Sequence, residues 1–233
     1  MTALLAVDGL RAGYGASTVL DDLSFSMGTE AISIVGRNGV GKSTLCHALF
    51  GLVPISRGTI RFKGRELQGL PPERIARSGL ALVPQGRRLF GSLTVQEHLN
   101  MFARSSRGKR WTPERVYELF PPLAERRRNG GTQLSGGEQQ MLAVGRALLL
   151  NADLVVMDEP SEGLAPTVVD TLIEATTLLV GEGTAVLVVE QNLWAATEIA
   201  DRQLVMVSGR IELETTATNL RDDRELQQRY LGV

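Results

Sequence analysis

The segment Gly36–Ser43 constrains the fold of this sequence more than any other. It fits the eight-position pattern of a phosphate-binding loop, in which Lys and Ser or Thr stand at fixed offsets after a glycine. A buried strand is expected before it, at Ala31–Val35, and a helix after it, at Leu45–Phe50. Because a simple glycine turn would not explain Lys42 and Ser43 between a strand and a helix, the order predicts a nucleotide-binding α/β fold.

The chemistry of this loop is that of phosphate binding. Its glycines let backbone N–H groups turn toward phosphate oxygens, and the helix N-terminus adds a partial positive charge. Lys42 is expected to reach the terminal phosphates of a nucleotide, and Ser43 to place its hydroxyl on Mg²⁺. The residues predicted here to contact the nucleotide are Gly36, Arg37, Asn38, Gly39, Val40, Gly41, Lys42, Ser43 and Thr44.

Composition excludes some partners. The 233 residues include 25 basic and 26 acidic ones, and this balance argues against a dedicated nucleic-acid binder. No apolar run approaches membrane-spanning length, and residues 1–8 lack the features of a signal peptide, so we expect a cytosolic protein whose membrane role is peripheral. The single cysteine, Cys46, is expected to be a small buried hydrophobe.

The first part of the chain predicts antiparallel strands. Residues 4–25 alternate apolar and polar side chains around a turn expected at 11–17. Tyr14 lies in this turn, and two interpretations of it are equally supported. It stacks on a planar base, a contact worth roughly 1–3 kcal/mol in nucleic-acid complexes, or it packs on its own hairpin.

Downstream of the loop, a second polar side chain is expected at the same sheet edge. A strand at Gly58–Gly64 and a helix at Pro71–Ala76 precede a buried strand at Gly79–Val83. Ligands of open α/β sheets gather at the carboxyl ends of the strands. Gln85 therefore is a candidate contact of Mg²⁺ or of an attacking water, and a plain loop residue is the alternative.

Residues 92–150 differ in character from the rest. Residues 92–129 have helical periodicity and no buried-strand run, which predicts an inserted helical lobe. The basic clusters 107–110 and 126–128 are interpreted as solvated faces, with phospholipid headgroups as the alternative for one of them. Leu134–Glu138 then begins the helix that ends this segment.

This helix start permits two interpretations. Ser135 and Glu138 fit a capping box. However, Gly136 and Gly137 also expose backbone N–H groups, which makes a second candidate anion site. One nucleotide does not need two such sites from one chain.

A pair of carboxylates marks the next strand end. Leu154–Met157 predicts a buried strand that delivers Asp158 and Glu159. Such carboxylates are costly to bury without a cation, so we expect Asp158 to hold Mg²⁺ and Glu159 to orient or deprotonate a water that attacks the γ-phosphate.

The last third completes the α/β pattern. The elements expected here are a helix at 166–180, a strand at 184–189 that ends at Glu190-Gln191-Asn192, a helix at 193–200, strands at 203–207 and 210–213, and one amphipathic helix at 219–231.

Taken together, these motifs resemble the ATP-binding subunit of ABC transporters over essentially the whole chain. Gly36–Ser43 resembles Walker A, Leu154–Asp158 resembles Walker B, and Leu134–Glu138 resembles the ABC signature. The resemblance implies a single domain with a P-loop NTPase (RecA-like) core, an N-terminal antiparallel β subdomain and an inserted α-helical subdomain. The core would comprise residues 1–91 and 151–233, and the helical subdomain residues 92–150.

The resemblance also assigns roles and partners. Tyr14 would stack on adenine, Gln85 would be the Q-loop glutamine, Glu159 the catalytic base and residues 161–165 the D-loop. ATP and Mg²⁺ would be the cofactors. Two ATPase subunits would dimerise head to tail, so that Ser135, Gly136, Gly137 and Glu138 serve the partner's nucleotide. Two transmembrane permease subunits and a solute-binding protein would complete an importer.

Within the family, the chain is most similar to the smaller ATPase of branched-chain amino-acid importers. The segments that carry this similarity are Pro84–Phe90, Gly137–Met141, Glu162–Pro166, Val189–Asn192 and the ending Tyr230-Leu231-Gly232. Importers of amides or urea are an alternative. Gln191 stands where most such ATPases carry a histidine that contacts the γ-phosphate, and glutamine cannot become a cation.

This departure leaves two further hypotheses. One is an ATPase with attenuated hydrolysis at this site, paired with a different, histidine-bearing subunit. The other is a nucleotide-dependent regulatory module without significant turnover. A soluble ABC protein of DNA repair or translation is not favoured, since 233 residues leave no room for its coiled coil or second cassette.

Overall fold

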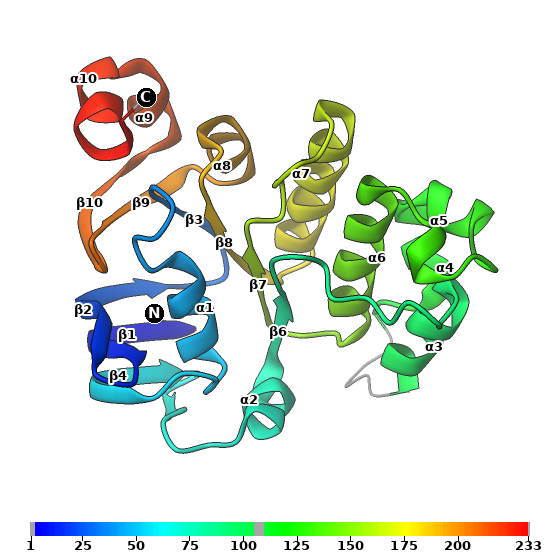
Figure 1. Cartoon of the computed structure of the whole chain (residues 1–233), viewed down its shortest axis with the longest axis horizontal. Helices are drawn as coiled ribbons and strands as arrows, with labels where there is room; N and C mark the ends of the chain where they lie inside the picture. The colour runs from blue at the N-terminus through cyan, green and yellow to red at the C-terminus, as the bar shows by residue number, and fades with distance from the viewer. Residues whose placement is uncertain (1–2, 105–109, 233) are drawn as a thin grey trace.

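A computed structural model describes residues 3–104 and 110–232 and shows an α/β protein with two sheets (Figure 1). In the described part of the chain, the first sheet has four strands in the order β2-β1-β4-β5, and its β1 pairs antiparallel with β2 and β4. Its strands are β1 (Leu5–Tyr14), β2 (Ser17–Met27), β4 (Ile55–Phe62) and β5 (Arg65–Glu66). The N-terminal antiparallel portion expected from the alternating pattern is therefore present.

The second sheet has the order β10-β9-β3-β8-β7-β6 and is parallel except for β10. Its strands are β3 (Ala31–Val35), β6 (Leu80–Val83), β7 (Leu154–Asp158), β8 (Ala185–Glu190), β9 (Arg202–Val207) and β10 (Arg210–Thr216). The parallel neighbours β6, β7 and β8 are consecutive strands joined by segments that contain helices, and β3 pairs with β8 and β9 from much later in the sequence. The fold class expected from the sequence, α/β of the P-loop type, is confirmed.

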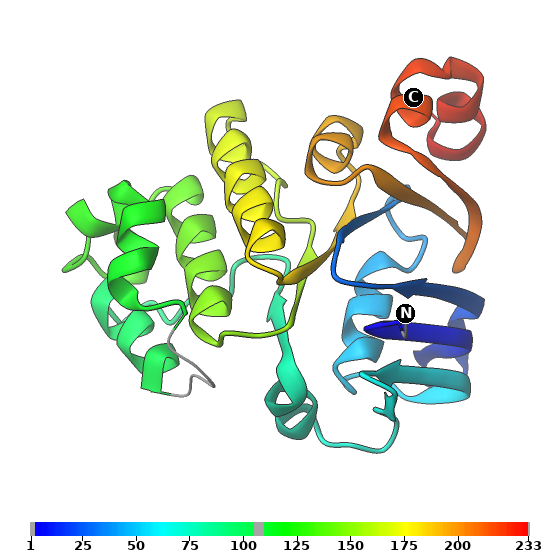
Figure 2. The same cartoon turned by 180° about the vertical axis from the view of Figure 1, so that it is seen from behind.

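Helices lie on both sides of the parallel sheet, and α3, α4 and α5 lie beyond α6, away from it (Figures 1 and 2). The helices of the described residues are α1 (Lys42–Leu49), α2 (Pro72–Gly79), α3 (Val95–Arg104), α4 (Pro113–Leu119), α5 (Pro121–Glu125), the 3₁₀ turn η1 (Gly131–Gln133), α6 (Gly136–Leu149), α7 (Pro166–Gly181), α8 (Leu193–Ile199), α9 (Ala217–Asp222), α10 (Arg224–Leu226) and the π-helical turn η2 (Gln227–Leu231). In the described part of the chain, no helix has the length and apolar character needed to span a bilayer.

The parallel strands divide their side chains between two cores. In β7, Leu154 and Val156 belong to the core that includes α1 and the antiparallel sheet. Val155 and Met157 of the same strand belong to the core that includes α6 and α7. Successive side chains of a strand point to opposite faces, so an apolar run without alternation is what a strand covered on both faces requires. Cys46 is fully buried in the first core, as expected, and burial raises the pKa of its thiol.

Two local predictions need correction. The turn expected at 11–17 is much tighter, because β1 extends to Tyr14 and β2 resumes at Ser17. A Cβ at Gly13 would lie 2.0 Å from the Ser17 carbonyl oxygen, so the absence of a side chain lets the strands approach this closely. The helix expected at Pro71–Ala76 continues to Gly79, where a φ of +120° ends it.

The single C-terminal helix expected at 219–231 is also wrong. The chain forms α9, α10 and η2 instead, with a break at Asp223, whose φ and ψ of −94° and 95° are extended. The Asp223 carboxylate accepts a hydrogen bond from Leu226 N (2.9 Å) and thereby starts a new helix. An aspartate in this role competes with helix continuation, and the amphipathic pattern alone does not reveal it.

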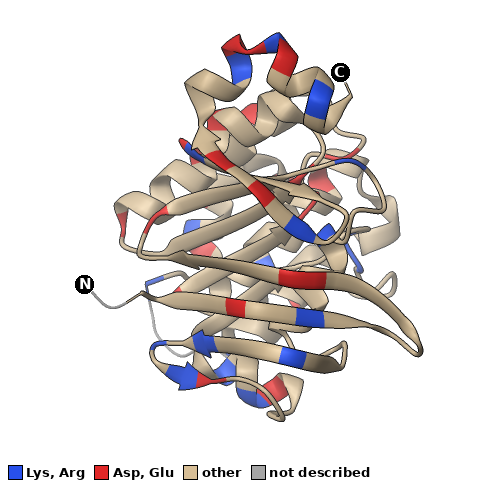
Figure 3. Cartoon of the chain, turned by 90° about the vertical axis from the view of Figure 1, so that its left-hand side faces the viewer, with Lys and Arg blue, Asp and Glu red and all other residues tan. Residues whose placement is uncertain are grey.

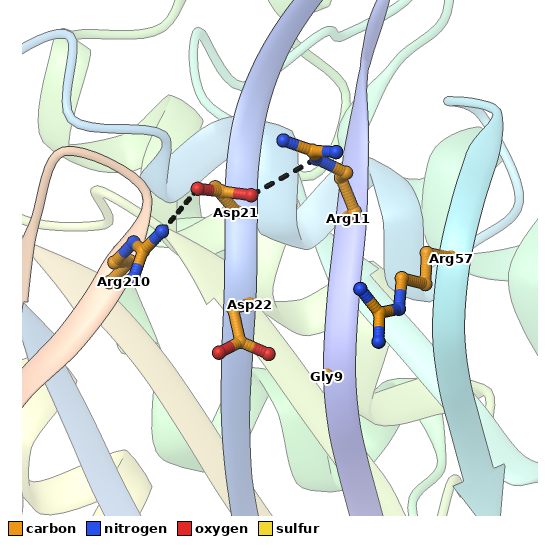
Figure 4. Close-up of a pocket in the computed structure, with 6 residues that line it drawn as sticks. All are labelled: Gly9, Arg11, Asp21, Asp22, Arg57 and Arg210. Carbon is orange, nitrogen blue, oxygen red and sulfur yellow. Dashed lines mark hydrogen bonds and ion pairs between the residues drawn. The ribbon is translucent and has the colours of Figure 1, made fainter.

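The antiparallel sheet exposes one charged face on which basic and acidic residues are interspersed (Figure 3). Its edge strand β2 is joined to β10 by Asp21, which lies between Arg11 of β1 (3.0 Å) and Arg210 of β10 (Figure 4). The hydrogen bond from Arg210 is the main cause that lowers the pKa of Asp21. Asp21 N also donates to Gly209 O (3.1 Å), and a Cβ at Gly209 would lie 2.0 Å from Val19 O. These contacts link the two sheets at their edges.

The described residues of the two basic clusters in the helical segment differ in their contacts. Residues 107–109 lie outside the described residues. Arg110 donates to Glu182 O (3.1 Å) and Thr184 Oγ1 (2.9 Å), so it attaches the start of α4 to the end of α7 and is not simply a solvated side chain. Residues 126–128 are exposed, and Arg126 lies 3.6 Å from Glu138.

His98 of α3 fastens the loop that follows β6. The ring is fully buried, and its Nε2 accepts a hydrogen bond from Phe90 N (3.0 Å). Nδ1 lies 2.9 Å from Thr94 O, which can only accept, so the proton of the neutral ring is on Nδ1. Burial is the largest cause that lowers the pKa of His98, with Arg146 acting in the same direction and Thr94 and Glu97 opposing it.

We predict that His98 makes the protein sensitive to mild acid. Its folded-state pKa lies below the unfolded value of about 6.5, so the unfolded chain binds a proton first as the pH falls. The free energy of unfolding should therefore decrease below about pH 6.5, by at most about 1.4 kcal/mol per pH unit from this residue. Urea unfolding between pH 5 and 7.5 measures it.

The matched variant is His98→Gln, which keeps an acceptor for Phe90 N but cannot titrate. It should flatten this part of the pH profile. Identical profiles for the wild type and His98→Gln would contradict the assignment.

Candidate functional site

The loop between β3 and α1 has the backbone geometry that a phosphate site requires. Gly39 and Gly41 adopt positive φ values of +81° and +113°, a region that favours glycine. A Cβ at Gly36 would lie 2.6 Å from Met206 O, so that position also excludes a side chain. The helix begins at Lys42, earlier than the expected Leu45, which places Lys42 within its first turn.

Lys42 is buried, with 4% of its surface exposed. Its Nζ donates to Gly36 O (2.8 Å) and Arg37 O (3.0 Å) and forms an ion pair with Glu159 Oε1 (3.0 Å). All three partners are oxygens, so the ammonium is held in the loop where phosphate oxygens would bind. A bound phosphate would compete with Glu159 for this cation.

Ser43 and Asp158 meet across the site. Ser43 Oγ donates to Asp158 Oδ1 (3.0 Å), which joins the first turn of α1 to the end of β7. Asp158 is 2% exposed, and burial raises its pKa, while the bond from Ser43 opposes this shift. A hydroxyl and a carboxylate oxygen side by side are the hard oxygen ligands that Mg²⁺ prefers. The donor set therefore fits this ion.

Glu159 follows directly and has an unusual backbone. Its φ is +47°, a conformation that non-glycine residues seldom adopt, and its N–H donates to Val189 O of β8 (2.9 Å). The carboxylate of Glu159 lies 3.0 Å from Lys42 Nζ. Gln85 Nε2 donates to Glu159 Oε2 (3.2 Å) and to Glu162 Oε2 (3.0 Å). Gln85 thus reaches Glu159, the carboxylate expected to act on water, through its amide nitrogen, and it also contacts Glu162, to which the sequence assigned no role.

The loop after Gln85 is held by the helical segment. Arg146 of α6 donates to Arg87 O (2.7 Å) and Arg88 O (3.1 Å), and both of these residues have positive φ values. Its guanidinium also lies 5.3 Å from the Phe102 ring centroid. Burial lowers the pKa of Arg146 to about 10. His98 of α3 binds the same loop at Phe90 N. Helices α3 and α6 together therefore fix the position of the loop that follows Gln85.

Gln191 lies at the end of β8 and is exposed. It lines a cavity with Glu159 and Ser161, so the structure brings it to the same edge as the two carboxylates of β7. Its backbone N–H donates to the Glu190 side chain (3.1 Å). The sequence indicated Glu190 only as a strand end. A carboxylate closing a fully apolar strand was the available signal.

Tyr14 is 50% exposed, and its hydroxyl lies 3.1 Å from His47 Nδ1 on α1. The ring is therefore tied to the helix that carries Lys42 and not to its own hairpin alone. Nothing in the sequence pattern linked Tyr14 to His47, since residues 33 positions apart share no local motif.

The signature segment makes the expected capping box. Glu138 N donates to Ser135 Oγ (3.3 Å), and Ser135 N donates to Glu138 Oε2 (2.7 Å). Gly137 also has a packing reason, because a Cβ there would lie 2.7 Å from Val168 Cγ2 of α7. The helix α6 and the helix α1 lie on opposite sides of β7 in both views (Figures 1 and 2). The two anion-binding candidates of one chain are therefore separate places.

Comparisons with known proteins identify the family. The family model described as ABC transporter matches residues 20–162. The chain is 41% identical over 232 residues to the high-affinity branched-chain amino acid transport ATP-binding protein BraG of Pseudomonas aeruginosa, covering 98% of this chain and 100% of that protein. It is 35% identical to the probable branched-chain amino acid transport ATP-binding protein LivF of Archaeoglobus fulgidus, covering 96% and 97%.

Solved structures give the same result. A structure of an ATP-binding subunit of an ABC transporter has a TM-score of 0.81 and 30% identity, covering 98% of this chain and 96% of that one. Together with the phosphate loop and the facing carboxylates, the family match and the full-length relatives show that this chain belongs to the ABC transporter family as an ATP-binding subunit with ATPase activity.

Proposed function

We propose that this chain energises the uptake of branched-chain amino acids by hydrolysing ATP on an importer. The full-length similarity to BraG and LivF supports the solute class. The observation that carries the catalytic part is the convergence of the Lys42–Glu159 ion pair and the Ser43–Asp158 hydrogen bond at the carboxyl ends of β3 and β7. Open α/β sheets bind their ligands at this edge.

Each of these residues has a role in the proposed site. The loop from Gly36 to Thr44 binds the phosphates through backbone N–H groups, and Lys42 exchanges its carbonyl and carboxylate partners for phosphate oxygens. Tyr14, raised on β1 beside α1, stacks on the adenine. Glu159 orients and deprotonates the attacking water, and Gln191 binds the γ-phosphate by hydrogen bonds.

Ser43 and Asp158 would hold Mg²⁺, and the side-chain amide oxygen of Gln85 would be the third ligand from this chain. The ion offsets the negative charge of the nucleotide phosphates when it is bound. Gln85 binds Glu159 and Glu162 through its other amide atom, so it would keep both carboxylates in place while it contacts the ion.

The partners follow from the separation of the two anion-binding candidates. Ser135, Gly136, Gly137 and Glu138 would cover the ATP bound to a second ATPase subunit in a head-to-tail dimer, in which the hydroxyl of Ser135 turns from its helix cap to the γ-phosphate. Residues 92–150 would form a helical subdomain against the core of residues 1–91 and 151–233. Two permease subunits and a solute-binding protein would complete the importer, with this chain peripheral on the cytoplasmic face of the membrane.

Replacing Glu159 should separate binding from hydrolysis. In Glu159→Gln the water loses its base, so turnover should fall by about 10²–10⁴-fold. ATP affinity should be retained, because the phosphate loop is unchanged and Lys42 loses a competitor for phosphate. ATPase assays of the reconstituted complex measure turnover, and ATP titration of the purified subunit measures affinity. The matched control is Glu162→Gln, which changes the other carboxylate bound to Gln85 and should retain most of the activity. Equal turnover in the wild type and Glu159→Gln would overturn the role.

Gln191 should limit turnover at the site built from this chain's loop. In the reconstituted complex, Gln191→His should raise turnover at least about threefold and make it depend on pH near 6.5, since the imidazole can become a cation. Gln191→Ala should lower it, because the hydrogen bonds to phosphate are lost. A rate that stays unchanged in Gln191→His would count against a limiting role.

The solute class requires a transport measurement. Cells that lack this chain should lose high-affinity uptake of radiolabelled leucine, isoleucine and valine, and the wild-type chain should restore it while Glu159→Gln should not. Uptake of urea and short amides should be unaffected. Loss of urea or amide uptake with normal leucine uptake would replace the proposed solute with the alternative.

A further inference from the structure

Glu190 is a buried carboxylate at the end of β8, with 2% of its surface exposed. Within residues 3–104 and 110–232, no Lys, Arg or His forms an ion pair with it. Burying a carboxylate without a cation is costly unless hydrogen bonds compensate. The compensation here comes from backbone N–H groups of two separate loops.

The two carboxylate oxygens serve different loops. Oε1 accepts a hydrogen bond from Ser161 N (2.9 Å), in the loop that follows Glu159. Oε2 accepts from Gln191 N (3.1 Å) and Asn192 N (3.2 Å), in the loop that follows β8. The Glu190 carbonyl oxygen accepts from Gly36 N (3.3 Å), at the start of the phosphate loop. One residue thus contacts three segments around the proposed nucleotide site.

The loop after Glu159 depends on this contact. It folds on itself through Glu162 N to Glu159 O (3.2 Å) and Leu164 N to Ser161 O (3.2 Å). The N–H of Ser161 is directed instead to the end of β8. A cavity of about 370 Å³ opens beside these residues and is lined by both loops, so the Glu190 carboxylate lies where the two loops face each other.

The hydrogen bonds require an ionised carboxylate and not an amide. Both oxygens accept hydrogen bonds from backbone N–H groups, and a glutamine has one acceptor oxygen and an NH₂ group that would face one of these donors. Burial raises the pKa of Glu190, and the Ser161 backbone N–H and hydroxyl, together with the N–H groups of Asn192 and Gln191, oppose that shift. Charge-assisted hydrogen bonds of this kind are about twice as strong as neutral ones.

We propose that Glu190 is a positioning residue that fastens the loop after Glu159 to the loop carrying Gln191, so that the two side chains keep a defined relation across the γ-phosphate. The residue acts through its neighbours and does not touch the nucleotide. The hydrogen bonds that join the two loops lie within this chain. Their effect on turnover rests on the proposed roles of Glu159 and Gln191.

The test compares the wild type, Glu190→Gln and Leu187→Val. The last variant removes one methylene from the fully buried core side of the same strand and serves as a control for lost stability. Residue-resolved amide hydrogen exchange on the isolated subunit reports the fastening. ATP titration of the subunit and kcat and KM of the reconstituted complex report its consequence.

In Glu190→Gln, exchange should rise at least about tenfold, either at Ser161 or at Gln191 and Asn192 together, because one amide oxygen cannot serve both sides. The amides of β3 and α1 should be unaffected, and ATP affinity should change by less than about twofold. The kcat should fall about tenfold with little change in KM. Leu187→Val should lower the melting temperature without these selective changes.

Unchanged exchange at all three amides in Glu190→Gln would overturn the proposal, as would a kcat that stays at the wild-type value. If Glu190→Gln does not fold, the wild type decides: exchange of the three amides at the rate of unstructured peptide overturns the fastening, and protection comparable to that of β8 supports it. The exchange result needs no turnover, so it stands or falls separately from the transport function.

Discussion

The buried ammonium of Lys42 is the constraint on which the site depends. Desolvating a cation is expensive, and removing one partner of a buried ion pair costs about 3–5 kcal/mol. Here the two loop carbonyls of Gly36 and Arg37 and the carboxylate of Glu159 compensate the charge. The phosphate loop therefore surrounds its own lysine, and the ion pair holds Glu159 near the position that a γ-phosphate would take. The interaction preorganises the site and also gives the nucleotide a contact to displace.

Sequence periodicity predicted the framework because burial on both faces leaves a direct signature. The apolar runs of β3, β7 and β8 carry no alternation, and the residues that follow them are the polar ones of the site. The phosphate loop was equally predictable, since its glycines are dictated by positive φ values and close approaches that no other residue tolerates. Local rules of this kind do not depend on the rest of the chain.

What the sequence did not reveal comes from contacts between distant segments. The bond between Tyr14 and His47, and the bridge from Glu190 to Ser161, join residues with no common motif. The prediction of one continuous C-terminal helix was wrong for a local reason. The carboxylate of Asp223 caps a new helix, and this outweighs the amphipathic pattern that favours a continuous one. The roles assigned to the individual site residues remain predictions, although the geometry brings most of them to one sheet edge.

Gln85 connects this edge to the helical segment. Its amide binds Glu159 and Glu162, while the loop just after it is held through Arg87 and Arg88 by Arg146. The buried guanidinium of Arg146 donates to the carbonyl oxygens of Arg87 and Arg88, two residues with positive φ values. These hydrogen bonds therefore fix the position of the guanidinium and the conformation of the loop together. A path of contacts therefore leads from α6 to Glu159, through the carbonyls of Arg87 and Arg88, the backbone at Gly86 and the Gln85 side chain. In an ATPase that drives a membrane partner, such a path lets the state of the γ-phosphate and the position of the helices bias each other.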